Sequence, residues 1–228
     1  MDMPVEKKIV FELNGKSIEA FEGETILEAA DRIGVEIPRL CYKEGIRADG
    51  NCRACVVEID GERALAPSCC RYPTEGMKVT SNEGKARHSQ EMVLELLLAD
   101  MPDQKNSPYS LDSELDFWKD KLGVQTSRFP QRHQPVEDES HPAISVHLDA
   151  CIQCTRCVRA CREEQVNDVI GYAWRGTHSA IVFDLDDPMG TSSCVGCGEC
   201  VQAVSYTHLR AHETREDLVF RLLVEKKK

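Results

Sequence analysis

The stretch "CIQCTRCVRAC", Cys151–Cys161, decides how the C-terminal half of this chain is organised. Its cysteines follow the spacing C-x2-C-x2-C-x3-C, in which three thiolates surround one corner of a cubane iron–sulfur cluster. A second run, "CVGCGEC", follows at Cys194–Cys200. Because two such runs occur in one chain, a chance cysteine-rich helix is a poor alternative. The two runs together predict a pair of [4Fe–4S] sites.

In a two-cluster ferredoxin the fourth cysteine of each run ligates the other cluster. One [4Fe–4S] cluster is therefore expected to take Cys161, Cys194, Cys197 and Cys200. The other is expected to take Cys151, Cys154, Cys157 and the residue at position 204.

The second run normally continues with x3-C-P, but Val204 and Ser205 stand at those positions. Valine cannot coordinate iron, so the second cluster would keep three thiolates. That favours a [3Fe–4S] form, an exogenous ligand or loss of the cluster. We also expect the C-terminal part of this region to fold poorly, because cluster binding is coupled to folding.

A separate set of four cysteines lies nearer the N-terminus, with the spacing Cys41-x10-Cys52-x2-Cys55-x13-Cys69. Four thiolates are what a [2Fe–2S] cluster needs. Gly50 and Asn51 allow a tight turn, so that amides can point at the cluster sulfurs. A zinc site is the alternative, but zinc would be suited by two C-x2-C pairs and only one is present. Cys70 is expected to be a packed thiol and not a ligand.

The order of elements around this first set is hairpin, helix, cysteine loop, hairpin. The hairpins turn at Asn14-Gly15 and Asp60-Gly61. This order predicts an α+β chain with a β-grasp [2Fe–2S] ferredoxin domain at residues 1–83. The following ranges are a helical connector and linker at 84–142 and a two-cluster [4Fe–4S] ferredoxin-like domain at 143–203. The remaining range, 204–228, is expected to be a non-native tail.

Composition excludes several classes of function. A net charge of −11 argues against nucleic-acid binding, because no basic patch could neutralise a phosphate backbone. Twelve cysteines without an export signal indicate metal and not disulfides. No apolar run is long enough to span a membrane, and a cytoplasmic location is expected. No nucleophile–base pair, phosphate loop or catalytic carboxylate pair stands out, so no catalytic residue is assigned.

Residues 1–203 resemble the N-terminal region of NAD-dependent, molybdenum-containing formate dehydrogenase α subunits, relatives of the large iron–sulfur subunit of respiratory complex I. The residues that carry the resemblance are "LCYKEGIRADGNCRACVVEIDG", "PSCCRYPTEGM", "SRFP", "HLDACIQCTRCVRACREEQVNDVIGYAWRG" and "DDPMGTSSCVGCGECVQA". The resemblance implies that electrons from formate oxidation at a molybdopterin site pass through the clusters. They would reach a flavin- and NAD-binding diaphorase subunit, with other iron–sulfur subunits as partners. The molybdopterin domain would lie outside these residues.

Two departures from this family stand out. Many relatives hold a further [4Fe–4S] cluster with one histidine and three cysteines, and His88 stands at the histidine position. No cysteine lies between Cys70 and Cys151, so we expect that cluster to be absent and His88 to be a polar residue on a helix. The second departure is "VSYTHLRAHET" at Val204–Thr214, which is similar to translated sequencing adapters, where the family would read "CPTGAL".

Two other functions remain open from the sequence. The first is the iron–sulfur diaphorase subunit of an NAD-reducing hydrogenase or of a complex-I-like NADH dehydrogenase, whose overall length suits this chain. Such subunits usually keep the histidine-ligated cluster, which counts against it. The second is a zinc-stabilised interaction protein without a redox role.

Overall fold

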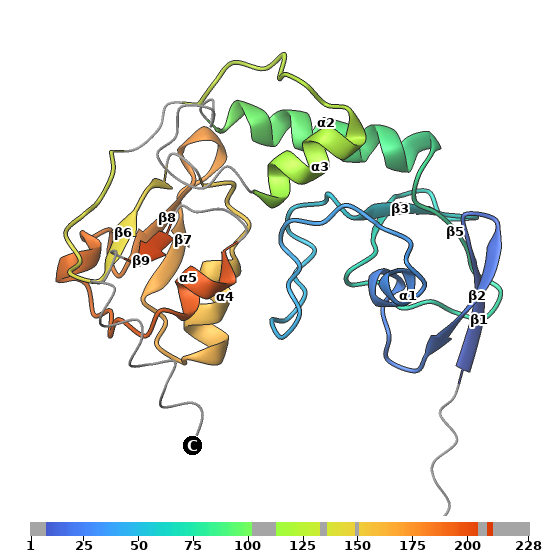
Figure 1. The fold of residues 1–228 in the computed structure, drawn as a ribbon, viewed down its shortest axis with the longest axis horizontal. Coiled ribbons are helices and arrows are strands. Elements are labelled where there is room, and N and C mark those ends of the chain that lie inside the picture. Colours follow the sequence, from blue (N-terminus) through green and yellow to red (C-terminus); the bar gives the residue numbers. More distant parts are fainter. Residues whose placement is uncertain (1–7, 102–112, 133–135, 149–150, 205–208, 212–228) are drawn as a thin grey trace, which may run out of the picture.

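The chain folds into two cysteine-bearing regions joined by a pair of helices, α2 and α3, as the computed structural model shows (Figure 1). The structure describes residues 8–101, 113–132, 136–148, 151–204 and 209–211. Its elements are β1 Lys8–Leu13, β2 Lys16–Phe21, α1 Ile26–Arg32, β3 Val56–Ile59, β4 Ala66–Pro67, β5 Lys78–Thr80, α2 Gly84–Ala99, α3 Glu114–Leu122, β6 Ile144–Val146, α4 Arg156–Arg159, η3 Ala160–Glu164, β7 Ile170–Ala173, η4 Gly176–His178, β8 Ala180–Phe183, η5 Met189–Thr191, α5 Glu199–Ala203 and β9 Leu209–Ala211.

The first region is a five-stranded mixed sheet with the strand order β2-β1-β5-β3-β4. Strands β1 and β2 form the predicted antiparallel hairpin, and β3 pairs antiparallel with β4. Strand β5, which the sequence did not reveal, runs parallel to β1 and antiparallel to β3. It is only three residues long, too short for an alternation of apolar side chains to stand out. The β-grasp arrangement expected from the sequence is confirmed.

Buried and exposed side chains alternate along the hairpin, and the buried ones face the core of the first region. Phe11 and Leu13 in β1 are buried, and Ala20 in β2 faces the same interior. Helix α1 covers this face with Ile26 and Leu27, both fully buried. Its start is fixed by a capping box between Thr25 and Glu28, which satisfies amides that the first turn leaves unpaired.

The helical connector expected at residues 84–142 contains the helices α2 and α3. Ser113 caps α3 by accepting a hydrogen bond from the Asp116 amide, and Gly123 ends the helix in a left-handed conformation. Helix α2 packs against β3, and the Gln90 side chain is 1% exposed. Its amide nitrogen donates to the carbonyls of Val56 and Ser81, at 2.9 and 2.8 Å. This side chain ties the connector to the sheet.

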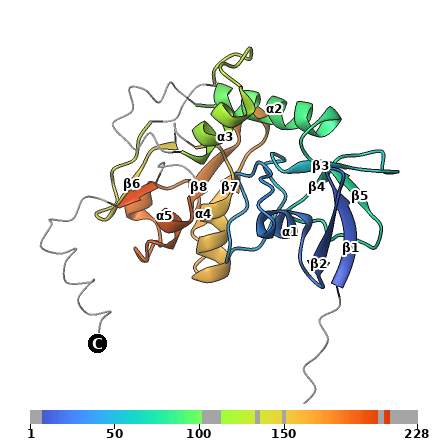
Figure 2. The same ribbon diagram turned by 45° about the vertical axis from the view of Figure 1, so that its right-hand side comes forward.

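The third region, which is the C-terminal cysteine-bearing region after the connector helices, has two small antiparallel sheets. One consists of β7 and β8, and the other consists of β6 and β9. Helix α4 runs directly into a π-helical segment, η3, a rare geometry that is often found at functional sites. Helices α4 and α5 lie side by side (Figures 1 and 2). The fold therefore brings both cubane-type cysteine runs, Cys151–Cys161 and Cys194–Cys200, into one core.

Part of the segment expected to be non-native packs against this region. Leu209, in β9, is 2% exposed and lies in the same core cluster as Ile144 of β6. Backbone pairing makes few sequence demands, so an extended segment of unrelated origin can supply such a strand. The expectation about Val204–Lys228 stays a prediction, and most of that range, 205–208 and 212–228, lies outside the described residues.

One apolar cluster joins the connector to both cysteine regions. It contains Leu94 of α2 and Trp118 of α3 together with Cys41 and Cys154. At its edge the guanidinium of Arg156, whose side chain is 2% exposed, forms two hydrogen bonds of 2.8 and 2.7 Å with the Glu114 carboxylate. Apolar packing therefore holds both regions to the connector, and the half-buried ion pair between Arg156 and Glu114 ties α4 to α3.

We predict that replacing Gln90 by Leu lowers the free energy of unfolding by about 1–3 kcal/mol, because two buried carbonyls lose their donor. His88→Leu, a change in the same helix, is the control and should be close to neutral. Chemical denaturation of the anaerobically reconstituted protein measures both. Equal stability of the two variants would mean that the Gln90 hydrogen bonds contribute little.

A second prediction concerns the buried ion pair. Glu114→Ala leaves the Arg156 guanidinium buried without its carboxylate and should destabilise the chain by about 2 kcal/mol. That is less than a fully buried pair would give, since the Glu114 side chain is 43% exposed. Glu22→Ala, at an exposed carboxylate, should change the unfolding midpoint little. Similar midpoints for both variants would contradict the structural role given to the pair.

Candidate cluster-binding sites

The four cysteines of the first set converge in the structure as the sequence predicts. Cys55 Sγ and Cys69 Sγ lie 3.4 Å apart and share a hydrogen bond, and Cys41 accepts hydrogen bonds from the Cys52 and Cys69 thiols. Three of the four side chains are at most 1% exposed, and Cys52 is half-buried. One thiol comes from each end of the set and two from the loop between, so the donors surround one small volume.

Backbone amides of the loop point at this volume. The Cys52 N–H donates to Cys41 Sγ at 3.4 Å, and the Asn51 N–H also donates to Cys41. Gly50 makes this turn possible, because its φ of +60° is a conformation that side chains disfavour. A Cβ at this position would lie 3.2 Å from Cys70 Sγ. Amides at this turn thus contact the sulfur of Cys41, and the expected hydrogen bonds to the sulfurs of the cluster stay a prediction.

The thiols of the first set hydrogen-bond to one another, and these bonds shift their pKa values. Hydrogen bonds from Cys52 and Cys69 lower the pKa of Cys41 to about 2, and the same bonds raise the pKa of both donors. The hydrogen bond with Cys69 lowers the pKa of Cys55 to about 7. Sulfurs this close share protons when no metal is bound, and a metal needs them as thiolates. Four convergent thiols with amide donors fit the needs of a [2Fe–2S] cluster.

One expectation about this set is wrong. Cys70 is exposed and not packed, although its Sγ lies 3.6 Å from Cys69 Sγ. Cys69 takes the interior position, with no exposed surface, and its neighbour is left on the outer side of the same turn. His88 lies on α2, as expected for a polar residue on a helix.

The cysteines of the third region lie close enough together to influence one another's protonation, and their division into two ligand sets stays a prediction. Cys200 lies near Cys194, Cys197 and Cys161, whose negative charges would raise its pKa. Cys157 lies near Cys151 and Cys154, with Cys200 as a further neighbour. Cys161, one turn after Cys157, lies in η3 and near Cys200 of the second run. It needs this position if it is to ligate the cluster of the second run and not the cluster of its own run.

Burial dominates the protonation of these thiols. It raises the pKa of Cys151 and of Cys200 to about 12, and it raises the pKa of Cys157 well above its ordinary value. Because cluster binding requires thiolates, assembly of either cluster must release protons from this core. Cys197 is exposed and Cys194 is half-buried, so the group around Cys200 lies closer to the surface. Both donor sets consist of thiols, which suits iron–sulfur clusters.

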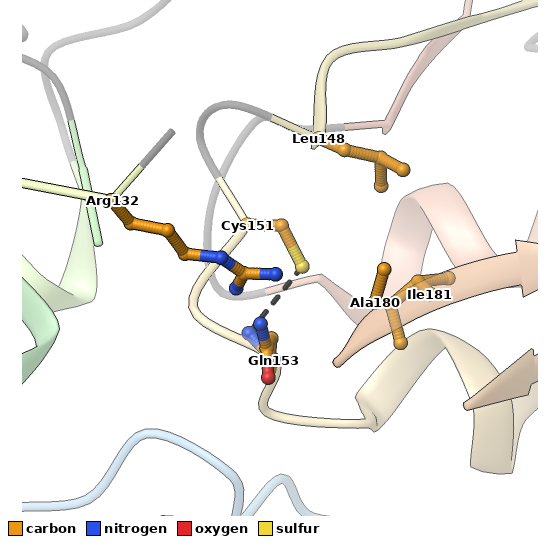
Figure 3. A pocket seen from close by; sticks show the side chains of 6 residues that line it. All are labelled: Arg132, Leu148, Cys151, Gln153, Ala180 and Ile181. Atoms are coloured by element: carbon orange, nitrogen blue, oxygen red, sulfur yellow. Dashed lines mark hydrogen bonds between the residues drawn. The ribbon is translucent and has the colours of Figure 1, made fainter. Parts of the chain in front are cut away.

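A cavity opens beside Cys151, and Arg132 from the linker lines it (Figure 3). The Gln153 N–H donates to Cys151 Sγ at 3.3 Å. The Arg132 guanidinium favours the thiolate of Cys151, although burial of that thiol is the larger effect. Sequence reasoning missed Arg132 because it lies in a polar, proline-bearing stretch that carried no motif. The lining residues are Arg132, Leu148, Cys151, Gln153, Ala180 and Ile181.

The loops of the first and second sets touch each other. The Asn51 side-chain amide donates to the Gln153 carbonyl at 3.2 Å and to Thr155 Oγ1 at 3.3 Å. Figure 2 shows the cysteine loop after α1 lying beside α4. Since Cys41, Cys52 and Cys154 also share one apolar cluster, the two sites are neighbours in a common core.

Within the described ranges, no three or more His, Cys, Asp or Glu side chains are arranged to hold a single metal ion. Among the helices of the same described ranges, none has the length and apolar character needed to cross a membrane.

Two family models match the chain. A 2Fe-2S iron-sulfur cluster binding domain covers residues 6–84. The ferredoxin-like domain of NADH-quinone oxidoreductase subunit 3 covers residues 141–193. The chain therefore carries a [2Fe–2S] domain followed by a [4Fe–4S] ferredoxin-like domain, and the cofactors expected from the sequence are confirmed at that level.

Relatives of three kinds match most of the chain. A NADP-reducing hydrogenase subunit from Solidesulfovibrio fructosivorans is 32% identical over 88% of this chain and 36% of its own length. A formate dehydrogenase-like protein from Staphylococcus haemolyticus is 27% identical over 86% of this chain and 20% of its own length. An NADH-quinone oxidoreductase subunit from Rhizobium meliloti is 34% identical over 83% of this chain and 22% of its own length.

A solved structure is similar along nearly its whole length. It is a chain of an NAD+-reducing [NiFe]-hydrogenase in the H2-reduced state, with 27% identity and a TM-score of 0.80. The match covers 91% of this chain and 89% of that one. By contrast, the chain spans only about a fifth to a third of the length of the curated relatives. The chain is thus an iron–sulfur electron-transfer module related to formate dehydrogenase, NADH-quinone oxidoreductase and NAD-reducing hydrogenase subunits.

Proposed function

We propose that this chain is the N-terminal electron-transfer module of a formate dehydrogenase α subunit. In this proposal it relays electrons from formate oxidation toward a flavin- and NAD-binding diaphorase subunit. Formate oxidation belongs to a molybdopterin domain outside these 228 residues. The redox part of the proposal is supported by the cysteine spacing, which divides the thiols into groups, and by the contacts of the first group, where Cys55 Sγ lies 3.4 Å from Cys69 Sγ and the Cys52 amide donates to Cys41 Sγ.

The proposed ligands follow from that grouping. A [2Fe–2S] cluster takes Cys41, Cys52, Cys55 and Cys69, and a [4Fe–4S] cluster takes Cys161, Cys194, Cys197 and Cys200. Cys151, Cys154 and Cys157 hold another cluster with an incomplete ligand set. When bound, the clusters supply one-electron transfer. The residues themselves hold the clusters, exclude water from the buried thiols and keep the first two loops in contact.

Val204 stands where the incomplete set would need its fourth ligand. Its backbone directly follows α5, and its side chain packs against the apolar core that contains Cys151 and Cys157. A thiolate at this position would face the same core, whereas valine offers no donor. We infer that the site holds three protein ligands, which favours a [3Fe–4S] form.

Val204→Cys tests this inference. After anaerobic reconstitution, the variant should approach about ten irons per chain, the content of one [2Fe–2S] and two [4Fe–4S] clusters, while the parent chain stays below that. Any [3Fe–4S] signal in the electron paramagnetic resonance (EPR) spectrum of the oxidised parent should fall in the variant. Val201→Cys adds a thiol within α5, three residues earlier and against the same core, and should not raise the iron content.

Two outcomes would contradict the inference. If the parent chain already binds about ten irons, a fourth ligand is not missing. If Val204→Cys and Val201→Cys raise iron equally, the added thiols bind iron without specificity. A colourless parent protein that contains zinc would instead support the interaction-protein alternative, because zinc–thiolate sites do not absorb visible light.

A specific observation favours a second candidate, the iron–sulfur diaphorase subunit of an NAD-reducing hydrogenase. The similar hydrogenase chain matches over 89% of its own length, whereas the formate dehydrogenase-like relative matches over 20%. Long-read sequencing of the source DNA across codon 203 separates the two. Cys-Pro followed by a molybdopterin domain supports the formate dehydrogenase proposal. A valine codon with a stop after Lys228 would overturn it and favour a free-standing carrier.

A further inference from the structure

A single buried arginine contacts the backbone of both neighbouring cysteine sets. Arg159, in α4, is 3% exposed. Its Nη2 donates to the Cys41 carbonyl at 2.6 Å and lies 3.4 Å from the Cys154 carbonyl, which also accepts from it. Its Nη1 donates to the Arg47 carbonyl. One planar cation therefore lies between a ligand residue of the first set and a ligand residue of the second.

The charge of this guanidinium is only weakly compensated. Its acceptors among the described residues are all carbonyl oxygens, and the nearest carboxylate atom there, Asp49 Oδ2, lies 4.0 Å from Nε. In the same part of the chain the Nε atom finds no hydrogen-bond partner. Arg156, three residues earlier and equally buried, differs because Glu114 binds it through both carboxylate oxygens. The positive charge of Arg159 therefore has a more distant counter-charge than that of Arg156, 4.0 Å against 2.7 Å.

We propose that Arg159 is a positioning residue that clamps the Cys41 loop against the Cys154 loop and raises the reduction potential of the [2Fe–2S] cluster. The inference rests on the proposed function, since it needs the cluster to be held by Cys41, Cys52, Cys55 and Cys69. Reduction adds a negative charge to the cluster. A nearby cation stabilises that charge, and burial keeps the interaction strong because solvent and salt screen it poorly.

The guanidinium shape matters as well as its charge. Arginine presents five donors in a rigid fork, so it can bind several carbonyls in one plane, whereas a lysine ammonium is a compact point charge. Lysine at this position would retain the charge but lose some of the hydrogen bonds to the backbone carbonyls. The two roles of Arg159 are therefore separable by substitution.

The experiment is a reductive titration of the reconstituted full-length chain, followed by the EPR signal of the reduced [2Fe–2S] cluster. Arg159→Met should make one-electron reduction less favourable by about tenfold or more, equal to a downward shift of about 59 mV. The shift should persist at high salt, because the lost charge was buried. Arg159→Lys should recover most of the parent potential.

Arg162→Met is the matched control. Arg162 follows in η3, its side chain is 54% exposed, and it pairs with Asp168 at 2.6 Å. Removing this solvent-screened charge should alter the reduction equilibrium by less than about threefold. If Arg159→Met does not retain its cluster, Arg159→Gln takes its place, because glutamine can still donate to one carbonyl but carries no charge.

The outcomes distinguish failure of the inference from failure of the proposed function. A parent chain that forms no [2Fe–2S] signal would overturn the proposed function itself. A normal parent signal with unchanged potential in the uncharged Arg159 variants would overturn the inference alone. The inference also fails if Arg159→Lys lowers the reduction potential of the cluster as much as Arg159→Met does, because the charge of Arg159 would then not be what raises that potential.

Discussion

The contact between the two cysteine loops is the constraint on which the arrangement of the sites depends. Arg159 binds carbonyls of Cys41 and Cys154, and Asn51 reaches the loop that follows Cys151. Backbone carbonyls buried at such a junction need donors, and a guanidinium satisfies several at once. The connector helices cover this junction with apolar side chains, so the two sites cannot separate without exposing a core.

Neighbouring sulfurs and burial set the pKa values of the thiols. In the first set, neighbouring sulfurs share protons, and the pKa of Cys41 falls while the pKa of its donors rises. In the third region, burial raises the pKa of Cys151, Cys157 and Cys200. Cluster assembly must convert these groups to thiolates, so cluster binding and folding are thermodynamically linked. Val204 affects this linkage, because it places an apolar side chain where the incomplete cluster would need a fourth thiolate.

Much of the candidate site could be predicted from the sequence, because ligand spacing is a local property. The spacing of the run Cys151–Cys161 predicts that Cys161 ligates the cluster of the second run, and Cys161 is an electrostatic neighbour of Cys200 in the structure. The hairpins and the ends of α3 were predictable for the same reason, since turn and cap residues act over a few positions. The exposure of Cys70 was not, because the spacing that selects Cys69 says nothing about whether the neighbouring side chain is packed or exposed.

By itself, the sequence determined the three cysteine sets, the order of the regions and the absence of a fourth thiol at position 204. These are properties of residue type and spacing. Only the tertiary structure decided that the first two sets are neighbours, that β5 lies in the middle of its sheet, and that Arg132, Arg156 and Arg159 lie beside the cysteines. Each of these depends on contacts between residues tens to more than a hundred positions apart, for which no periodicity in the chain gives a signal.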